Sequence, residues 1–135
     1  MSVQFGALAN AAETYSCSAD RSAGFNWSGG EWIPTAFPAD EQLLVKPNGL
    51  KDGMLQYQVF RMGDQTPYLD DCSQLIYQGT PLARIACGGM AKGILIDTKR
   101  LRYQEIYGIG YLDAFDSEQH SPSITIGRCK VIAPQ

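Results

Sequence analysis

Four cysteines are the residues of this sequence whose chemistry is easiest to anticipate. They are Cys17, Cys72, Cys87 and Cys129, an even set without a C-x-x-C pair. Structural zinc sites usually bring their ligands in such close pairs, so a metal site built from all four cysteines is not expected. In a reducing compartment they would be buried free thiols, whereas in an oxidising one they would pair as disulfides.

The segment between Cys72 and Cys87 predicts a β-hairpin, which favours one of the three possible pairings. A turn centred between Gly79 and Thr80 would place Cys72 directly opposite Cys87. Directly opposed residues at a non-hydrogen-bonded position of an antiparallel pair are close enough to be bridged. We therefore predict a disulfide between these two cysteines.

The remaining cysteines, Cys17 and Cys129, would then join the first strand to the last. In the chain-entropy model a disulfide that closes so wide a loop contributes roughly 4 to 5 kcal/mol, against about 3 kcal/mol for the hairpin loop. The bridge between the ends of the chain is thus expected to be the more important of the two.

The other residues capable of catalysis do not form a recognisable set. The single histidine, His120, lies in a polar segment, and the sequence identifies no nucleophile or carboxylate to accompany it. The acids within Asp113–Glu118 could hold calcium, but the EF-hand spacing is absent and acids in turns commonly cap the local backbone. We expect no catalytic site, no metal site and no cofactor, and we leave calcium binding by Asp113–Glu118 open.

Aromatic side chains are the best candidates for binding. Trp27 and Trp32 lie close together in the sequence, and Tyr103, Tyr107 and Tyr111 are spaced by four. Positions four apart in a strand share a face, so the three tyrosines could line one side of a sheet. Exposed tryptophan and tyrosine often anchor interfaces. The alternative is that the tryptophans fill the core and the tyrosines form cross-strand pairs.

The elements that would position these side chains are strands. Leu55–Val59 alternates apolar and polar residues, and Ser28–Glu31 predicts a tight hairpin. Pro34 and Pro38 make the stretch between them unsuitable for a central strand. Further candidate strands are 41–46, 72–77, 82–87, 93–97 and 101–107. The pattern predicts an all-β fold, a small antiparallel sandwich or barrel with about eight short strands and two disulfides.

The last strand carries an irregularity. Ile124 and Ile126 share one face, whereas Cys129 and Val131 would fall on the other. A bulge at Gly127 would bring all four to the same side, and glycine is suited to that position. We therefore predict a bulge in the last strand.

Composition suits one domain with a core of its own. The chain has 135 residues, of which 44% are hydrophobic and 19% charged, with a formal net charge of -3. The mildly acidic balance and scattered basic residues argue against a nucleic-acid partner, and no apolar run is long enough for membrane insertion.

The N-terminal residues are typical of a processed export signal. Phe5–Ala11 reads as the tail of a signal peptide with a small-x-small site, and cleavage after Ala11 would follow. The alternative is an ordinary alanine-rich arm or short helix. We therefore expect residues 1–11 to be a signal-peptide remnant or disordered arm and residues 12–135 to form a single β domain.

Motifs at both ends of this domain point to one group of proteins. They are Tyr15–Cys17, Ala23–Phe25 and Trp32 at the start, and Arg102–Tyr103, Tyr107, Gly110–Tyr111 and Ser121–Cys129 at the end. In these motifs the chain resembles small exported, cysteine-containing proteins of proteobacteria, a functionally uncharacterised group in which threonine is commoner where Ser121 stands. The resemblance implies export and disulfides, and implies no activity.

Several functions are compatible with these features. The sequence favours a non-catalytic periplasmic or secreted binding protein whose partner is another protein, for example an inhibitor or immunity-type protein. A lipocalin-like carrier of a small apolar ligand would require an enclosed apolar cavity. A phage or virion surface component is a third interpretation. An enzyme of unrecognised type would require a concave site where His120 or paired acids converge.

Overall fold

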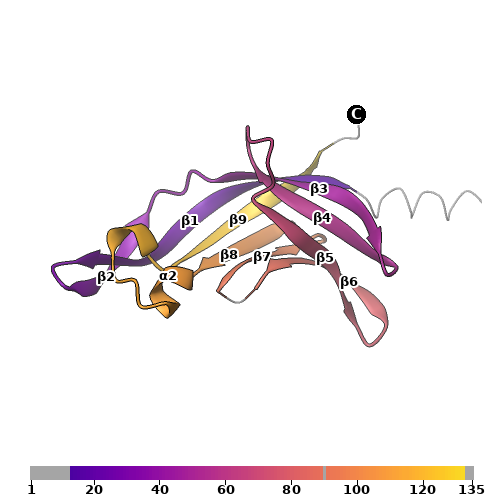
Figure 1. Ribbon diagram of the computed structural model, residues 1–135. Helices are drawn as coiled ribbons and strands as arrows, with labels where there is room; N and C mark the ends of the chain where they lie inside the picture. The colour runs from indigo at the N-terminus through magenta and orange to yellow at the C-terminus, as the bar shows by residue number, and fades with distance from the viewer. Residues whose placement is uncertain (1–12, 90, 133–135) are drawn as a thin grey trace, which may run out of the picture.

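A computed structural model describes residues 13–89 and 91–132 of the chain. The predicted signal remnant, residues 1–11, lies outside the described residues. The described strands are β1 (Thr14–Ser28), β2 (Glu31–Phe37), β3 (Gln42–Lys51), β4 (Met54–Arg61), β5 (Leu69–Tyr77), β6 (Thr80–Gly88), β7 (Lys92–Asp97), β8 (Arg102–Tyr107) and β9 (Ser123–Ile132). Between β8 and β9 lie a short helix, α2 (Ile109–Leu112), and a 3-10 turn, η1 (Glu118–His120) (Figure 1).

Eight antiparallel strands close into a barrel, and β2 is an extra strand. Closure comes from β1, which pairs with β3 along one edge and with β9 along the other. The all-β prediction is confirmed, and the barrel is the correct one of the two expected architectures.

The segments β2 and β3 behave as one interrupted strand. Both strands pair with β1. The pairs that flank the gap are Ser22–Phe37 for β2 and Ser18–Gln42 for β3. In the gap between them the amide of Ala19 still donates to the carbonyl of Glu41 at 3.0 Å. With β2 and β3 counted as one strand, the barrel is an up-and-down meander in which consecutive strands pair, and the pairing of β1 with β9 closes it.

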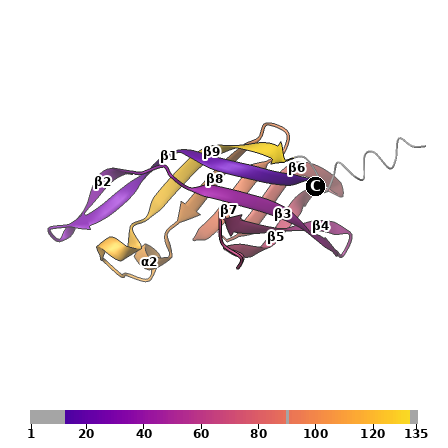
Figure 2. The ribbon, with the colours of Figure 1, turned by 90° about the horizontal axis from the view of Figure 1, so that it is seen from above.

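The far half of β1 and the whole of β2 form a hairpin that projects from the barrel, here called the arm (residues 22–37). Figures 1 and 2 show the arm and α2 at the same end of the molecule. Gly29 and Gly30 make its two-residue turn with φ of 62° and 83°, values that favour glycine. The predicted tight hairpin is confirmed, and Pro34 lies in an edge strand as expected.

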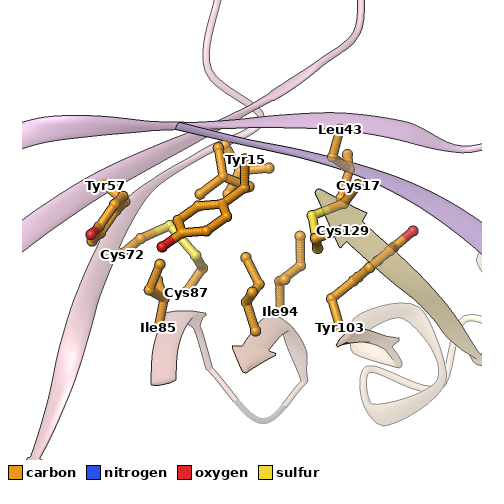
Figure 3. Packing of buried hydrophobic residues seen from close by; sticks show 13 residues of the cluster. Tyr15, Cys17, Leu43, Tyr57, Cys72, Ile85, Cys87, Ile94, Tyr103 and Cys129 are labelled. Atoms are coloured by element: carbon orange, nitrogen blue, oxygen red, sulfur yellow. A yellow bond between two sulfur atoms is a disulfide. The ribbon is translucent and has the colours of Figure 1, made fainter. Parts of the chain in front are cut away.

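The barrel interior is packed with side chains that alternate inward along the strands. Leu43 and Val45 of β3, Val59 of β4, Ile85 of β6 and Ile96 of β7 are almost completely buried. Each such side chain stabilises the fold by about 1.5–3 kcal/mol relative to an exposed one. Figure 3 shows that both disulfides lie within this cluster of 13 buried residues.

Both predicted disulfides are confirmed. Cys17–Cys129 joins directly paired residues of β1 and β9, with Cα atoms 3.9 Å apart. Cys72–Cys87 joins directly paired residues of β5 and β6, with Cα atoms 4.0 Å apart. Gly79 lies in the turn of this second hairpin, but the turn is centred one position earlier than predicted. A register shift between β5 and β6 restores the predicted pairing at the cysteines.

The predicted bulge is in the wrong strand. The register shift between β1 and β9 lies in β1, opposite Gly127. There Asp20, between Ala19 and Arg21, is the extra residue, whereas β9 itself is regular. Consequently Ile126 stays on the outer face of the barrel, where it is 50% exposed. The prediction failed because it placed every apolar side chain of β9 in the core.

The segment that contains α2 and η1 packs against β1 just before β9 begins. Phe25 donates its amide to the carbonyl of Pro122 at 3.0 Å, and the hydroxyl of Ser121 donates to Oδ1 of Asn26 at 3.4 Å. A Cβ atom at Gly24 would lie 2.0 Å from the Pro122 carbonyl oxygen, so only glycine permits this approach. Within the described part of the chain, neither helical segment has the length or apolar character needed to cross a bilayer.

Candidate functional site

Three of the five predicted binding residues form one group, here called the aromatic cluster (Trp27, Trp32 and Tyr111). Trp27 and Trp32 are directly paired across the arm, and their ring centroids are 5.1 Å apart at an interplanar angle of 63°. Tyr111 of α2 contacts Trp32 at 5.8 Å and 71°. Such edge-to-face contacts stabilise aromatic pairs by about 0.5–1.5 kcal/mol beyond burial. These ring contacts attach the arm to the segment between β8 and β9.

The other two predicted residues lie elsewhere. Tyr103 is buried inside the barrel and donates a hydrogen bond to Oε1 of Glu41 at 2.9 Å. Tyr107 is half-buried at the end of β8, with its hydroxyl 3.4 Å from Nδ1 of His120. The expectation that Tyr103, Tyr107 and Tyr111 line one side of a sheet is therefore wrong, because the strand ends at Tyr107 and Tyr111 is helical.

An apolar surface on the outer wall of the barrel was not predicted. It is here called the outer stripe: Ile106 of β8, Ile124 and Ile126 of β9, and Ala23 and Phe25 of β1. Ile124 is the direct pairing partner of both Ile106 and Ala23, so these residues point the same way. The sequence did contain a signal for this surface, since in a regular strand Ile124 and Ile126 lie on the opposite face from Cys129.

The stripe leads from the barrel wall onto the arm. Phe25 follows Ala23 on the same face of β1, and Trp27 follows Phe25. Phe25 is 46% exposed and Ile124 45% exposed. The outer stripe and the aromatic cluster are thus adjoining parts of one surface.

A second unexpected feature is a pair of carboxyl groups at the arm end of the barrel interior. Glu41, just before β3, accepts a hydrogen bond from the Tyr103 hydroxyl, and Glu105 of β8 accepts one from the Tyr68 hydroxyl. Glu105 is 8% exposed, and among the described residues its Oε1 has no hydrogen-bond partner. An unpaired carboxylate oxygen is costly to bury, so the site favours a proton between the two groups.

The electrostatics of this pair agree with a shared proton. Burial raises the pKa of Glu41 to about 8, and the hydrogen bond and negative charge of Glu105 act in the same direction. Burial and the neighbouring carboxyl groups also raise the pKa values of Tyr68 and Tyr103, so both phenols remain hydrogen-bond donors. At neutral pH a protonated Glu41 can donate to Glu105.

Two cations lie over the ring of Tyr68, the tyrosine that donates to Glu105. The guanidinium carbon of Arg61 lies 4.0 Å from the ring centroid of Tyr68, and Nζ of Lys92 lies 4.8 Å from it. A solvent-open hollow of about 600 Å³ reaches Glu41 and Arg61. Glu105 is not among the residues that line it, so the hollow gives a substrate access to one carboxyl group only.

The possible metal ligands do not gather. In residues 13–89 and 91–132, no three histidine, cysteine, aspartate or glutamate side chains are placed to hold a metal ion. This includes the acids of Asp113–Glu118, for which calcium was considered. His120 instead lies near an aromatic ring, that of Phe115, with centroids 5.4 Å apart.

Comparison with known proteins does not assign the chain to a family. No family model, no curated protein and no solved structure matches the chain. The resemblance to exported proteobacterial proteins therefore stays a prediction, and the function must be argued from the geometry.

Proposed function

We propose that this chain is a non-catalytic binding protein of the periplasm or the extracellular space, and that it docks onto another protein. The observation that carries the proposal is the continuous apolar surface formed by the outer stripe and the aromatic cluster. Within the aromatic cluster Tyr111 is 51% exposed, and the next residue along α2, Leu112, is 69% exposed. Contiguous exposed apolar groups on a small protein commonly mark a protein interface, and aromatic side chains supply most of the binding energy in such interfaces.

The scaffold supports this role because it holds the surface rigidly. The outer stripe belongs to strands of the closed barrel, and the aromatic contacts and the hydrogen bond from Phe25 to Pro122 attach the arm. A surface that is ordered before binding loses little conformational entropy on docking. Two disulfides are typical of proteins in an oxidising, extracytoplasmic environment.

The mode of docking follows from the free edge of the arm. The strand β2 has a pairing partner on one side only. In a two-residue hairpin closed by Ser28 and Glu31, the Phe25–Pro34 pair is a non-hydrogen-bonded one, so the nitrogen of Pro34 faces the free edge. Proline has no amide hydrogen, which interrupts this edge and disfavours the addition of a further strand. The partner is therefore expected to contact side chains.

The packed interior favours this proposal over a lipocalin-like carrier. The architecture itself would suit a carrier, but Val45, Val59, Ile94 and Ile96 fill the barrel together with both disulfides (Figure 3). Three hollows on the described residues, among them those lined by Arg102 and by Arg61, are at least partly open to solvent. A carrier of an apolar ligand would need an enclosed apolar space.

The test is affinity capture with the full chain as bait, from the extracytoplasmic fraction of cells that produce it. We expect one stoichiometric partner, whose recovery falls at least about tenfold with Phe25→Asp, because a buried charge in an interface costs more than 1.4 kcal/mol. Leu50→Asp is the matched control, since Leu50 is 70% exposed in β3 and lies outside the stripe. Failure to recover a partner, or equal recovery with Phe25→Asp, would contradict the proposal.

A further inference from the structure

The arginines of this acidic chain are concentrated on one flank of the barrel. Four of the six arginines, Arg84, Arg100, Arg102 and Arg128, lie on or beside β6 to β9. Arg84 pairs with Asp97, Asp97 with Arg102, and Arg102 with Arg128, so these residues form one lateral row across four strands. Directly paired residues point to the same side of a sheet, and here that side is the outer wall.

Three of these arginines contact carboxylates: Nη1 of Arg100 lies 3.5 Å from Oδ2 of Asp97, and the other two, Arg84 and Arg128, are held through Nε. Nε of Arg84 lies 2.8 Å from Oδ2 of Asp97, and Nε of Arg128 lies 3.0 Å from Oδ2 of Asp20. Asp20 is the extra residue of the bulge in β1, and a bulge commonly re-aims a side chain. Because the contacts of Arg84 and Arg128 use Nε, the terminal amino groups of both guanidinium groups stay available for a further acceptor.

Asp97 is itself fixed by the turn that follows β7. The amides of Lys99 and Arg100 donate to its Oδ1 at 3.0 Å and 2.6 Å. The hydrogen bond from the Arg100 amide, the largest favourable influence, together with the contact from Arg84, lowers the pKa of Asp97 to about 2. Asp97 therefore stays ionised over the physiological range and keeps Arg84 oriented.

A hollow of about 510 Å³ lies among these side chains. Arg84, Arg102 and Arg128 contribute to its lining, together with Gln104 and the carboxylates of Asp20 and Asp97 that hold two of these arginines. Arg102 has no ion-pair partner among the described residues, so its guanidinium group is free to bind an anion. Ile126 also lines the hollow and belongs to the outer stripe, which makes the two surfaces continuous.

We propose that this hollow binds carboxylate side chains of an acidic segment on the protein partner. Among the described residues, the hollow is lined by three arginines and by two carboxylates, those of Asp20 and Asp97, so it carries a local positive charge although the whole chain carries -3. Arginine binds carboxylates in two-pronged geometry, and oriented arginines lose less freedom when they do so. The inference rests on the proposed function, because the acidic segment belongs to the same partner that covers the outer stripe.

The test uses a short oligoglutamate peptide as probe and an oligoserine peptide as its neutral counterpart. At low ionic strength, NMR titration of the full chain should show oligoglutamate shifting the amide signals of Arg84, Arg102, Gln104 and Arg128, with no effect from oligoserine. Arg102→Gln should weaken oligoglutamate binding about tenfold or more, since it removes a charge-assisted contact without breaking an internal ion pair. Lys51→Gln, which removes a cation of β3 outside the hollow, should leave oligoglutamate binding unchanged.

Two results would overturn the inference. One is equal binding of oligoglutamate to the wild-type protein and to Arg102→Gln. The other is displacement of the peptide by inorganic phosphate at an equal concentration of charge, which would show a simple anion site. Phe25→Asp should still bind oligoglutamate, so the peptide assay and the partner capture can fail independently of each other.

Discussion

Glu41, just before β3, and Glu105 of β8 enter the barrel interior, and each accepts a hydrogen bond from a tyrosine hydroxyl. Sequence did not predict this pair, since Glu41 and Tyr103 are 62 residues apart and nothing in the pattern of either segment marks the other. The available signal was local. Tyr103 and Glu105 alternate on the same face of β8, so a buried tyrosine implied a buried glutamate beside it.

The raised pKa of Glu41 makes the stability of the fold depend on pH. In the unfolded chain Glu41 ionises near its ordinary value of 4.5, whereas in the folded protein it keeps its proton up to about 8. Within this window the folded state binds more protons, so the free energy of unfolding falls as pH rises from about 5 to about 8. Glu41→Gln is neutral in both states and should remove this fall, so the variant is more stable than the wild type above about pH 8.

Urea unfolding at several pH values measures this difference. Asp40→Asn is the matched control, because it removes an exposed carboxylate at the same end of the barrel and leaves the contact between Glu41 and Tyr103 intact. Equal pH slopes in the wild type and Glu41→Gln between about pH 5 and about pH 8 would show that no such proton is held.

At the scale of elements, the sequence predicted local pairings and missed those that depend on the closed barrel. The Cys72–Cys87 hairpin and the arm turn at Gly29 follow from short-range alternation and turn residues, and both are present. The bulge was misplaced because period two states which residues share a face, but does not say which face is inside. For Ile124 that choice is made by β1 and β8, its neighbours in the sheet.

Gly127 of β9 is the residue against which the bulge in β1 is packed. A Cβ atom there would lie 2.3 Å from the carbonyl oxygen of Ser18 and 2.4 Å from Cε1 of Tyr103. Gly127→Ala should therefore destabilise the protein by about 1–3 kcal/mol through overpacking, measured as a lower midpoint of urea unfolding. Gly89→Ala is the control, since a Cβ atom at Gly89 meets nothing within 4 Å. Equal midpoints for the two variants would contradict this account of the bulge.

At the scale of the whole molecule, closure of the barrel depends on the pairing of its first and last strands. The contacts between β1 and β9 include Cys17–Cys129, whose cysteines are separated by 112 residues. In a meander every other strand pair is close in sequence, so the β1–β9 pair is the one whose formation costs the most loop entropy. The proposed interface depends on this closure, because Phe25 and Ile124 belong to these two strands.

The two disulfides allow the effect of closure to be measured. The two disulfides close loops with sequence separations of 112 and 15. All four cysteines are buried, so the double variants Cys17→Ala/Cys129→Ala and Cys72→Ala/Cys87→Ala lose similar packing, and each serves as the packing control for the other. The chain-entropy model predicts that the first pair of substitutions lowers the free energy of unfolding by about 1.5–2 kcal/mol more than the second. Urea unfolding gives both values, and intact mass after alkylation confirms that the remaining disulfide has formed in each variant. An equal or larger loss for the hairpin bridge would mean that local strand pairing, rather than the union of the chain ends, limits the stability of the barrel.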